Sequence, residues 1–308
     1  MKHFLRLIRV VNLLIIVLTM VGVAYNLLKT NNYLNIDFQL LNYSLLVFST
    51  VIIAAAGNMI NDYFDVKADR VNKPKKLIIS KYLKKRWAIV LHWGLNLLAV
   101  FMSILLSIRY HSFLFVFIHL ISMNLLWFYS TYFKKKLLVG NVIIALLTAL
   151  VPMLSVWYFK VTNESSAPFS SYHQDTWSTY LDYSFIYFFA FSAFFQNLSR
   201  EISKDIQDVV GDKLIHVYSL PMKLGERKAG LISVVILQLP LLIGIIAITQ
   251  NWIQINLISS FLLLVSAILN VACFVLFIIR KSYPFETINT IIKWSMLVGI
   301  SALFTNTL

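Results

Sequence analysis

Cysteine, acidic residues and charge of any sign are scarce in this chain of 308 residues. The one cysteine, Cys273, lies inside an apolar run, so the chain has no internal disulfide and no cysteine-based metal site. Only 13% of the residues are charged, against about 25% in soluble proteins, whereas 59% are hydrophobic. This composition excludes a soluble globular, secreted, fibrous or disordered class. The sequence also lacks a Walker A motif, a glycine-rich dinucleotide fingerprint and an HExxH motif.

Long apolar runs recur from Ile8 to Phe304 and predict membrane-spanning helices. They approach the ~20 residues with which a helix crosses a bilayer, and they lack the alternation of a transmembrane barrel. We therefore expect an all-α polytopic membrane protein with about nine transmembrane helices, in which residues 1–308 form a single domain. The nine expected spans are Ile8–Leu28, Leu40–Met59, Ala88–Ile108, Phe113–Thr131, Leu138–Tyr158, Tyr183–Leu198, Leu231–Thr249, Ile255–Ile279 and Thr287–Thr305.

The basic residues are distributed unevenly between the two sides of these spans. The segments on one side carry 23 of the 27 Lys and Arg residues. The positive-inside rule then places the N-terminus in the cytoplasm and the C-terminus outside, in the cell membrane if the source is prokaryotic. Because the net charge of +14 is mostly this topology signal, we expect no nucleic-acid partner. Contact of the basic loops with anionic lipid headgroups is the alternative interpretation.

Six of the nine Asp residues lie in two clusters that have the same spacing. Residues 61–70 read NDYFDVKADR, and residues 204–213 read KDIQDVVGDK. Both contain DxxDxxxD followed by a basic residue, and each Asp of the second cluster lies 143 residues after its counterpart. On a helix, spacings of three and four place the three carboxylates on one face.

Four expected spans separate the two clusters, so both clusters lie on the cytoplasmic side and follow spans that run in the same direction. This arrangement predicts two similarly oriented four-helix units and a ninth helix around a central cavity, with the clusters facing one another across it. The aspartate-rich segments 58–74 and 200–213 would line the cytoplasmic end of that cavity.

Three carboxylates side by side repel one another, and a divalent cation between them removes the repulsion. Mg²⁺ prefers hard oxygen ligands and usually takes one or two carboxylates together with phosphate oxygens. Basic residues near the clusters would hold the remaining phosphate oxygens. The expected metal–diphosphate ligands are Asp62, Asp65, Asp69, Asp205, Asp208 and Asp212, and the expected diphosphate-binding bases are Arg70, Lys73, Arg200, Lys204 and Lys213. The simpler alternative is a pair of solvated helix ends with salt-bridged surface charges.

At these residues the sequence resembles the UbiA-type intramembrane prenyltransferase family. Its first signature, NxxxDxxxD, matches Asn61, Asp65 and Asp69, which adds Asn61 to the expected metal site. Its second, DxxxD after a Lys-Asp pair, matches Asp208 and Asp212. The segment that runs from Tyr129 through Lys134, Lys135 and Lys136 to Asn141 resembles the end of the family's fourth helix and the loop that follows.

The resemblance implies a prenyltransferase that moves a polyprenyl group from its diphosphate to a membrane-associated acceptor, with Mg²⁺ bridging the two motifs and the isoprenoid in a lipid-open tunnel. The strings around both motifs look most like the branch that alkylates geranylgeranylglyceryl phosphate with geranylgeranyl diphosphate in ether lipid synthesis. Members that prenylate aromatic acceptors of quinone or haem biosynthesis remain the alternative. Residues 76–81 depart from the family because they contain neither proline nor glycine. The expected substrate contacts are Tyr129, Lys134, Lys135, Asn141, His216 and Arg227.

Two other classes of membrane protein are compatible with parts of the pattern. A secondary transporter would have its acidic residues near mid-span, between broken helices, whereas here they lie at helix ends beside Lys and Arg. A CDP-alcohol phosphotransferase would also use Mg²⁺ and Asp, but its longer motif does not occur in the sequence. Both are weaker interpretations than a prenyltransferase.

Overall fold

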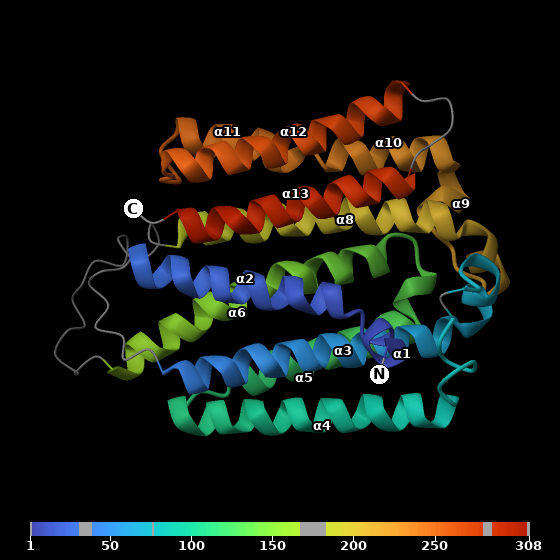
Figure 1. Ribbon diagram of the computed structural model, residues 1–308, viewed down its shortest axis with the longest axis horizontal. Helices are drawn as coiled ribbons and strands as arrows, with labels where there is room; N and C mark the ends of the chain where they lie inside the picture. Colours follow the sequence, from blue (N-terminus) through green and yellow to red (C-terminus); the bar gives the residue numbers. More distant parts are fainter. Residues whose placement is uncertain (1, 31–38, 76, 167–182, 280–284, 307–308) are drawn as a thin grey trace. The chain divides into compact units, whose positions relative to one another are not determined.

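The computed structural model describes residues 2–30, 39–75, 77–166, 183–279 and 285–306. The described chain is almost entirely helical, and its one β pairing there is an isolated bridge between Ile79 and Leu83. Figure 1 shows the helices in chain order, which are α1 (Lys2–Leu7), α2 (Val10–Thr30), α3 (Leu40–Asn72), α4 (Lys85–Tyr110), α5 (Leu114–Thr131), the 3₁₀ helix η1 (Phe133–Lys135), α6 (Val139–Ser166), α8 (Ser184–Leu214), α9 (Leu220–Leu224), α10 (Glu226–Ile236), α11 (Leu239–Thr249), α12 (Leu257–Ile279) and α13 (Phe285–Thr305).

Eight helical segments in the described chain are long and apolar enough to cross a membrane, which confirms the predicted all-helical membrane class. One of them, Glu226–Thr249, comprises α10 and α11, which meet just before Pro240. Proline lacks the N–H that would continue the helix, so a break is expected there. The sixth expected span, Tyr183–Leu198, corresponds to the first half of α8, which is not among these eight segments. The polar second half of α8 carries the second Asp cluster.

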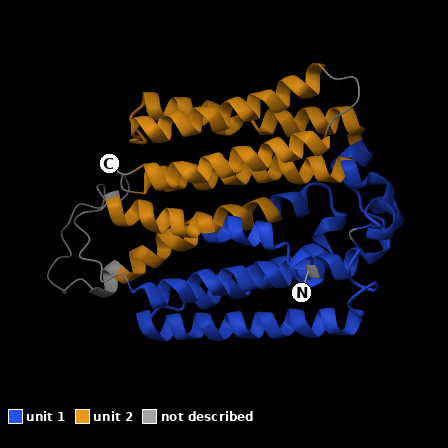
Figure 2. Ribbon diagram, in the orientation of Figure 1, with its two compact units in different colours: residues 1–17, 38–143, 207–223 blue, residues 18–37, 144–206, 224–308 orange. Residues whose placement is uncertain are grey.

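The chain divides into two compact units (Figure 2). Unit 1 comprises residues 1–17, 38–143 and 207–223, and unit 2 comprises residues 18–37, 144–206 and 224–308. The unit boundaries fall within α2, α6, α8 and α9, so several single helices contribute to both units.

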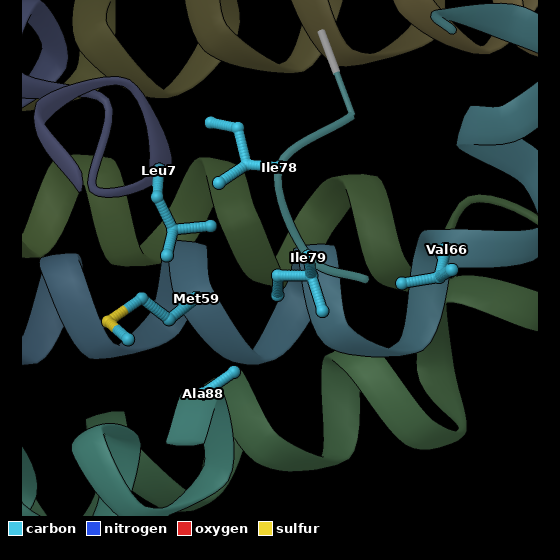
Figure 3. Packing of buried hydrophobic residues seen from close by; sticks show 6 residues of the cluster. All are labelled: Leu7, Met59, Val66, Ile78, Ile79 and Ala88. Carbon is cyan, nitrogen blue, oxygen red and sulfur yellow. The ribbon is translucent and has the colours of Figure 1, made fainter. Parts of the chain in front are cut away.

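Unit 1 is built on α3, which packs against α4 and α5. An apolar cluster joins α1, the second half of α3, the loop after α3 and the start of α4. Its members are Leu7, Met59, Val66, Ile78, Ile79 and Ala88 (Figure 3). In this loop the backbone N–H groups of Lys81, Tyr82 and Leu83 all donate to the carbonyl of Ile78. Ser80 takes a left-handed φ of 74°, the conformation that glycine usually supplies. Residues 78–83 of the loop between α3 and α4 therefore form a packed turn that contains neither proline nor glycine.

In unit 2, α12 packs against α13 and α10 packs against α12. Small hydroxyl side chains join the helices: Ser266 and Ser295 hydrogen-bond to one another at 2.8 Å, and Ser203 and Ser233 do so at 2.8 Å. Small polar residues let helices approach closely and satisfy one another in an apolar surrounding. Unit 2 therefore has the packing expected of membrane helices.

Candidate active site

The first Asp motif lies on the last turns of α3, beyond the apolar stretch that ends at Met59. Asp65 is buried, whereas Asp62 and Asp69 are half-buried. The Asn61 amide, one turn before Asp65, donates from Nδ2 to Oδ2 of Asp65 over 3.0 Å. Its other atom, Oδ1, is buried and accepts no hydrogen bond. A buried oxygen without a hydrogen-bond donor is costly unless a ligand uses it, which makes Asn61 a candidate ligand position.

The second motif enters unit 1 at the C-terminal end of α8, where Asp212 is buried and Asp208 is half-buried. Lys73, the residue after α3, forms an ion pair with Asp208. Asn72 hydrogen-bonds to the backbone of the same turn of α8. The two Asp motifs, far apart in the sequence, therefore meet within unit 1.

Lys134 lies between the two motifs. It belongs to η1, directly after α5, and its Nζ is 2.5 Å from Oδ2 of Asp65. Burial lowers the pKa of the Lys134 ammonium, but the charges of Asp65 and Asp212 more than offset this and raise its pKa above the usual range. Lys134 therefore remains protonated and supplies a positive charge between carboxylates of both motifs.

The pKa of Asp212, in the second motif, is shifted by its surroundings. Burial raises the pKa of Asp212 to about 6; Lys134 opposes this change, while Asp208 and Asp65 add to it. Burial and neighbouring carboxylates thus make the negative charge of Asp212 unfavourable, and a bound cation would relieve this.

In the part of the chain that the structure describes, no three His, Cys, Asp or Glu side chains lie close enough together to hold a metal ion. Lysines contact the carboxylates instead, at Asp65 and at Asp208. The atoms of the two motifs that could ligate a metal are nevertheless all carboxylate or amide oxygens, and they include the unsatisfied Oδ1 of Asn61. Such a set fits Mg²⁺ and not a soft metal.

The other predicted residues take no part in the Lys73–Asp208 and Lys134–Asp65 ion pairs. Asp62 forms an ion pair with Arg9, with Oδ1 and Nη2 2.7 Å apart. Lys204 and Arg200 lie on the part of α8 that belongs to unit 2, and both face Glu201 there. The remaining predicted residues are Asp205 in unit 2, half-buried; Arg70, Lys213, Lys135 and His216 in unit 1, exposed; Tyr129 and Asn141 in unit 1, half-buried; and Arg227 in unit 2, exposed.

Three residues of the site region were not expected from the sequence. Arg9 contacts Asp62 of the first motif, 53 residues later in the chain, and no local sequence pattern predicts such a contact. Asn72 lies two residues after the first motif and inside the aspartate-rich segment 58–74, which was the one available signal. Glu201 lies three residues before Lys204, a spacing at which helical ion pairs form.

The helices and the paired acidic motifs define a polytopic helical membrane protein with a polar, acidic site at the ends of α3 and α8. The model of the UbiA prenyltransferase family matches residues 15–284, and the chain belongs to that family. This confirms the resemblance that the two motifs indicate.

Among curated relatives, digeranylgeranylglyceryl phosphate synthase of Pyrococcus horikoshii is 31% identical over 179 residues, which are 58% of this chain and 55% of the relative. The synthase of Sulfurisphaera tokodaii is 34% identical over 188 residues, 60% of this chain and 59% of the relative. The chain thus matches less than two thirds of the length of these relatives.

Two solved structures share the fold along nearly the whole chain. One is a structure described for digeranylgeranylglyceryl phosphate synthase in membranes, with a TM-score of 0.56 at 23% identity. The match covers 99% of this chain and 98% of the chain in that structure. A UbiA homolog from Archaeoglobus fulgidus, bound to GPP and Mg²⁺, has a TM-score of 0.60 at 16% identity and covers 99% of both chains.

Proposed function

We propose that this protein transfers a polyprenyl group from its diphosphate to a membrane-associated acceptor. The observation that carries the proposal is the meeting of the two Asp motifs in unit 1, where Lys73 and Lys134 lie among the carboxylates. Carboxylates alone would suit a cation, and lysines alone would suit an anion. A site that holds both fits a metal–diphosphate ligand, which is the leaving group of a prenyl diphosphate.

The residues that would hold Mg²⁺ are Asn61, Asp65, Asp69, Asp208 and Asp212. When bound, the metal neutralises charge on the diphosphate and so favours ionisation of the bond between that group and the allylic carbon. The relative from Archaeoglobus fulgidus with GPP and Mg²⁺ supports this assignment.

Lys73 and Lys134 would bind diphosphate oxygens that no metal ligates. Both side chains are at most half exposed, so their charges act on the leaving group with little screening by water. Since Lys134 holds its proton firmly, its part is to stabilise negative charge and not to donate a proton.

We further propose that both motifs face the cytoplasm, with the N-terminus inside and the C-terminus outside. The uneven distribution of basic residues between the two sides of the spans supports this orientation. A cytoplasmic site would bind the diphosphate group at the aqueous side of the membrane while the isoprenoid chain remains in the bilayer. The lipid bilayer is thus a further partner of the protein.

For the acceptor we favour geranylgeranylglyceryl phosphate, with geranylgeranyl diphosphate as donor. The names of the relatives support this choice. Exposed bases next to the site support it too: Lys135 and Lys136 follow Lys134 directly. An acceptor that carries its own phosphate needs cations beyond those that hold the diphosphate, whereas an aromatic acid needs fewer.

The test is incubation of the purified protein with Mg²⁺, geranylgeranyl diphosphate and a panel of acceptors, with products identified by mass spectrometry. We expect an ether-linked product with geranylgeranylglyceryl phosphate that is lost on chelation of the metal. Transfer only to 4-hydroxybenzoate or a naphthoate would replace the acceptor and keep the transferase assignment. An absence of transfer to every acceptor, in folded protein, would contradict the proposed function.

A further inference from the structure

Asn72, the last residue of α3, is hydrogen-bonded to the backbone of α8 in both directions. Its Nδ2 donates to the carbonyl of Asp208 over 2.8 Å, and its Oδ1 accepts the backbone N–H of Gly211 over 2.8 Å. Both bonds are made by one side-chain amide, so they fix the position of α8 along α3 as well as its distance. This clasp lies entirely within unit 1.

Gly211 allows the close approach that these bonds need. A Cβ atom at this position would lie 2.5 Å from Nδ2 of Asn72 and 2.6 Å from the carbonyl oxygen of Ala68. Real Cβ atoms do not come so close, and the Ala68 oxygen belongs to the backbone and cannot turn away. Gly211 is buried in this contact. The two helices therefore touch backbone to backbone at a point where any larger residue would separate them.

The clasp joins the end of the first motif's helix to the backbone of the second motif. Asn72 lies three residues after Asp69, about one helical turn, and the two backbone groups it binds belong to Asp208 and to the residue before Asp212. A change in the position of Asn72 against α8 moves Asp208 and Asp212 together relative to Asp65 and Asp69. Asn72 itself offers no free oxygen to a ligand, because its Oδ1 is occupied by Gly211.

We infer that Asn72 and Gly211 form a positioning clasp that sets the separation of the two Asp motifs and thereby the affinity of the site for a metal–diphosphate ligand. This inference rests on the proposed function, because it takes that ligand as the one the motifs share. A metal site loses affinity when its ligands are displaced by fractions of an ångström, since metals such as Mg²⁺ demand a nearly ideal geometry.

The experiment compares Asn72→Ala with Asn58→Ala in the full-length protein. Asn58 is a matched control: it lies on the same helix, and its Nδ2 donates to the carbonyl of Ile8 over 2.9 Å, but the bond holds the N-terminal segment and not α8. The measured quantities are the affinity for Mn²⁺ together with geranylgeranyl thiolodiphosphate, read by electron paramagnetic resonance, and the Tm. Mn²⁺ serves as the spectroscopic substitute for Mg²⁺.

We expect Asn72→Ala to weaken Mn²⁺–thiolodiphosphate binding at least about tenfold and Asn58→Ala to change it less than about twofold, at similar losses of Tm. In turnover, the diphosphate KM of Asn72→Ala should rise while that of Asn58→Ala stays near the wild-type value. Binding by Asn72→Ala within twofold of the wild type, or equal weakening in both variants, would overturn the clasp. A wild-type protein that binds no Mn²⁺–thiolodiphosphate would overturn the proposed function instead.

Gly211→Ala provides a second measurement that does not remove the hydrogen-bonding groups of Asn72. It should weaken binding as well, because the added methyl group pushes α8 away from α3. In the Asn72→Ala background the same methyl group meets a smaller side chain, so we expect the two effects to be less than additive. Full additivity would show that the two residues act independently and would contradict the clasp.

Discussion

The ammonium group of Lys134 lies 2.5 Å from a carboxylate oxygen of Asp65, and both groups are largely withdrawn from solvent. In such a pair, each partner compensates for the lost hydration of the other, and removal of one leaves the other charge buried and uncompensated. The Lys134–Asp65 pair therefore ties the stability of unit 1 to the same groups that would bind the substrate.

Neutralising one carboxylate in each motif should abolish most of the activity. Asp65→Asn and Asp208→Asn keep the size of the side chain and remove its charge. We expect turnover to fall at least ~100-fold, on the scale of losing several kcal/mol of transition-state stabilisation. The measurement is steady-state prenyl transfer in protein whose membrane insertion and Tm have been checked. Near-normal turnover in either variant would show that its carboxylate is not part of the metal site.

Lys134→Gln should affect stability and substrate binding together. Loss of the buried ammonium leaves Asp65 without its partner, so the free energy of unfolding and the Tm should fall. Breaking a fully buried pair costs about 3–5 kcal/mol of stability, and the cost should be smaller here because the pair is partly exposed. The KM for the prenyl diphosphate should rise as well. Saturating Mg²⁺ should reverse part of the fall in Tm, because the cation compensates the negative charge of Asp65. Lys136→Gln, on an exposed base in the same connection, is the control and should leave both quantities nearly unchanged.

Binding of Mg²⁺ should weaken as the pH falls through 6. The pKa of Asp212 is raised from 3.8 to about 6 in the folded protein, so below pH 6 the carboxyl holds a proton that competes with the metal. For one competing proton the affinity falls up to tenfold per pH unit. Calorimetric titrations at pH 5, 6 and 7.5 measure this. In Asp212→Asn the dependence over this range should flatten, and an equally steep dependence in that variant would assign it to another group.

The pH dependence of stability has the opposite sign to that of Mg²⁺ binding: the stability of the metal-free protein falls as the pH rises. Without metal, the folded protein holds the Asp212 proton between pH 3.8 and 6, whereas the unfolded chain releases it. The contribution of this group to stability is therefore fully present below about pH 4 and is lost as the pH rises through 6. Added Mg²⁺ should reduce this loss, which a series of Tm values across the range would show.

The orientation of the chain can be tested with single cysteines in a Cys273→Ala background. Ser80 and Lys223 are exposed in unit 1 and belong to segments expected in the cytoplasm, whereas the exposed His111 connects α4 and α5 on the other side. Cysteines at Ser80 and Lys223 should react with a membrane-impermeant maleimide only from the cytoplasmic face, and a cysteine at His111 only from outside. The reverse pattern would invert the topology.

The sequence was informative where function depends on spacing along one helix. The three-and-four spacing of Asp62, Asp65 and Asp69 placed them on one helix, and the repeat of this spacing indicated that the motifs share a site. The structure brings Asp65, Asp208 and Asp212 together in unit 1. The apolar runs likewise predicted the helices, because hydrophobic length determines which segments cross a bilayer.

The sequence could not show which charges pair with one another. Lys73 and Lys134 reach carboxylates 135 and 69 residues away, and Arg9 takes Asp62. These pairs depend on how α3, η1 and the end of α8 pack. Arg200 and Lys204, which were expected at the diphosphate, contact Glu201 of the same helix, and a local ion pair of this kind needs no tertiary packing.

The packing of α1 has a consequence for the order in which the protein is made. Leu7, in the first helix, is buried against Ile78, Ile79 and Ala88, residues that are synthesised more than 70 positions later (Figure 3). The first helix can contact Met59 and Val66 once α3 has emerged, but its contacts with Ile78, Ile79 and Ala88 form only after the start of α4 has left the ribosome. The completed cluster joins α1, α3, the loop after α3 and the start of α4, so protease protection of α1 during translation would report when this part of unit 1 has folded.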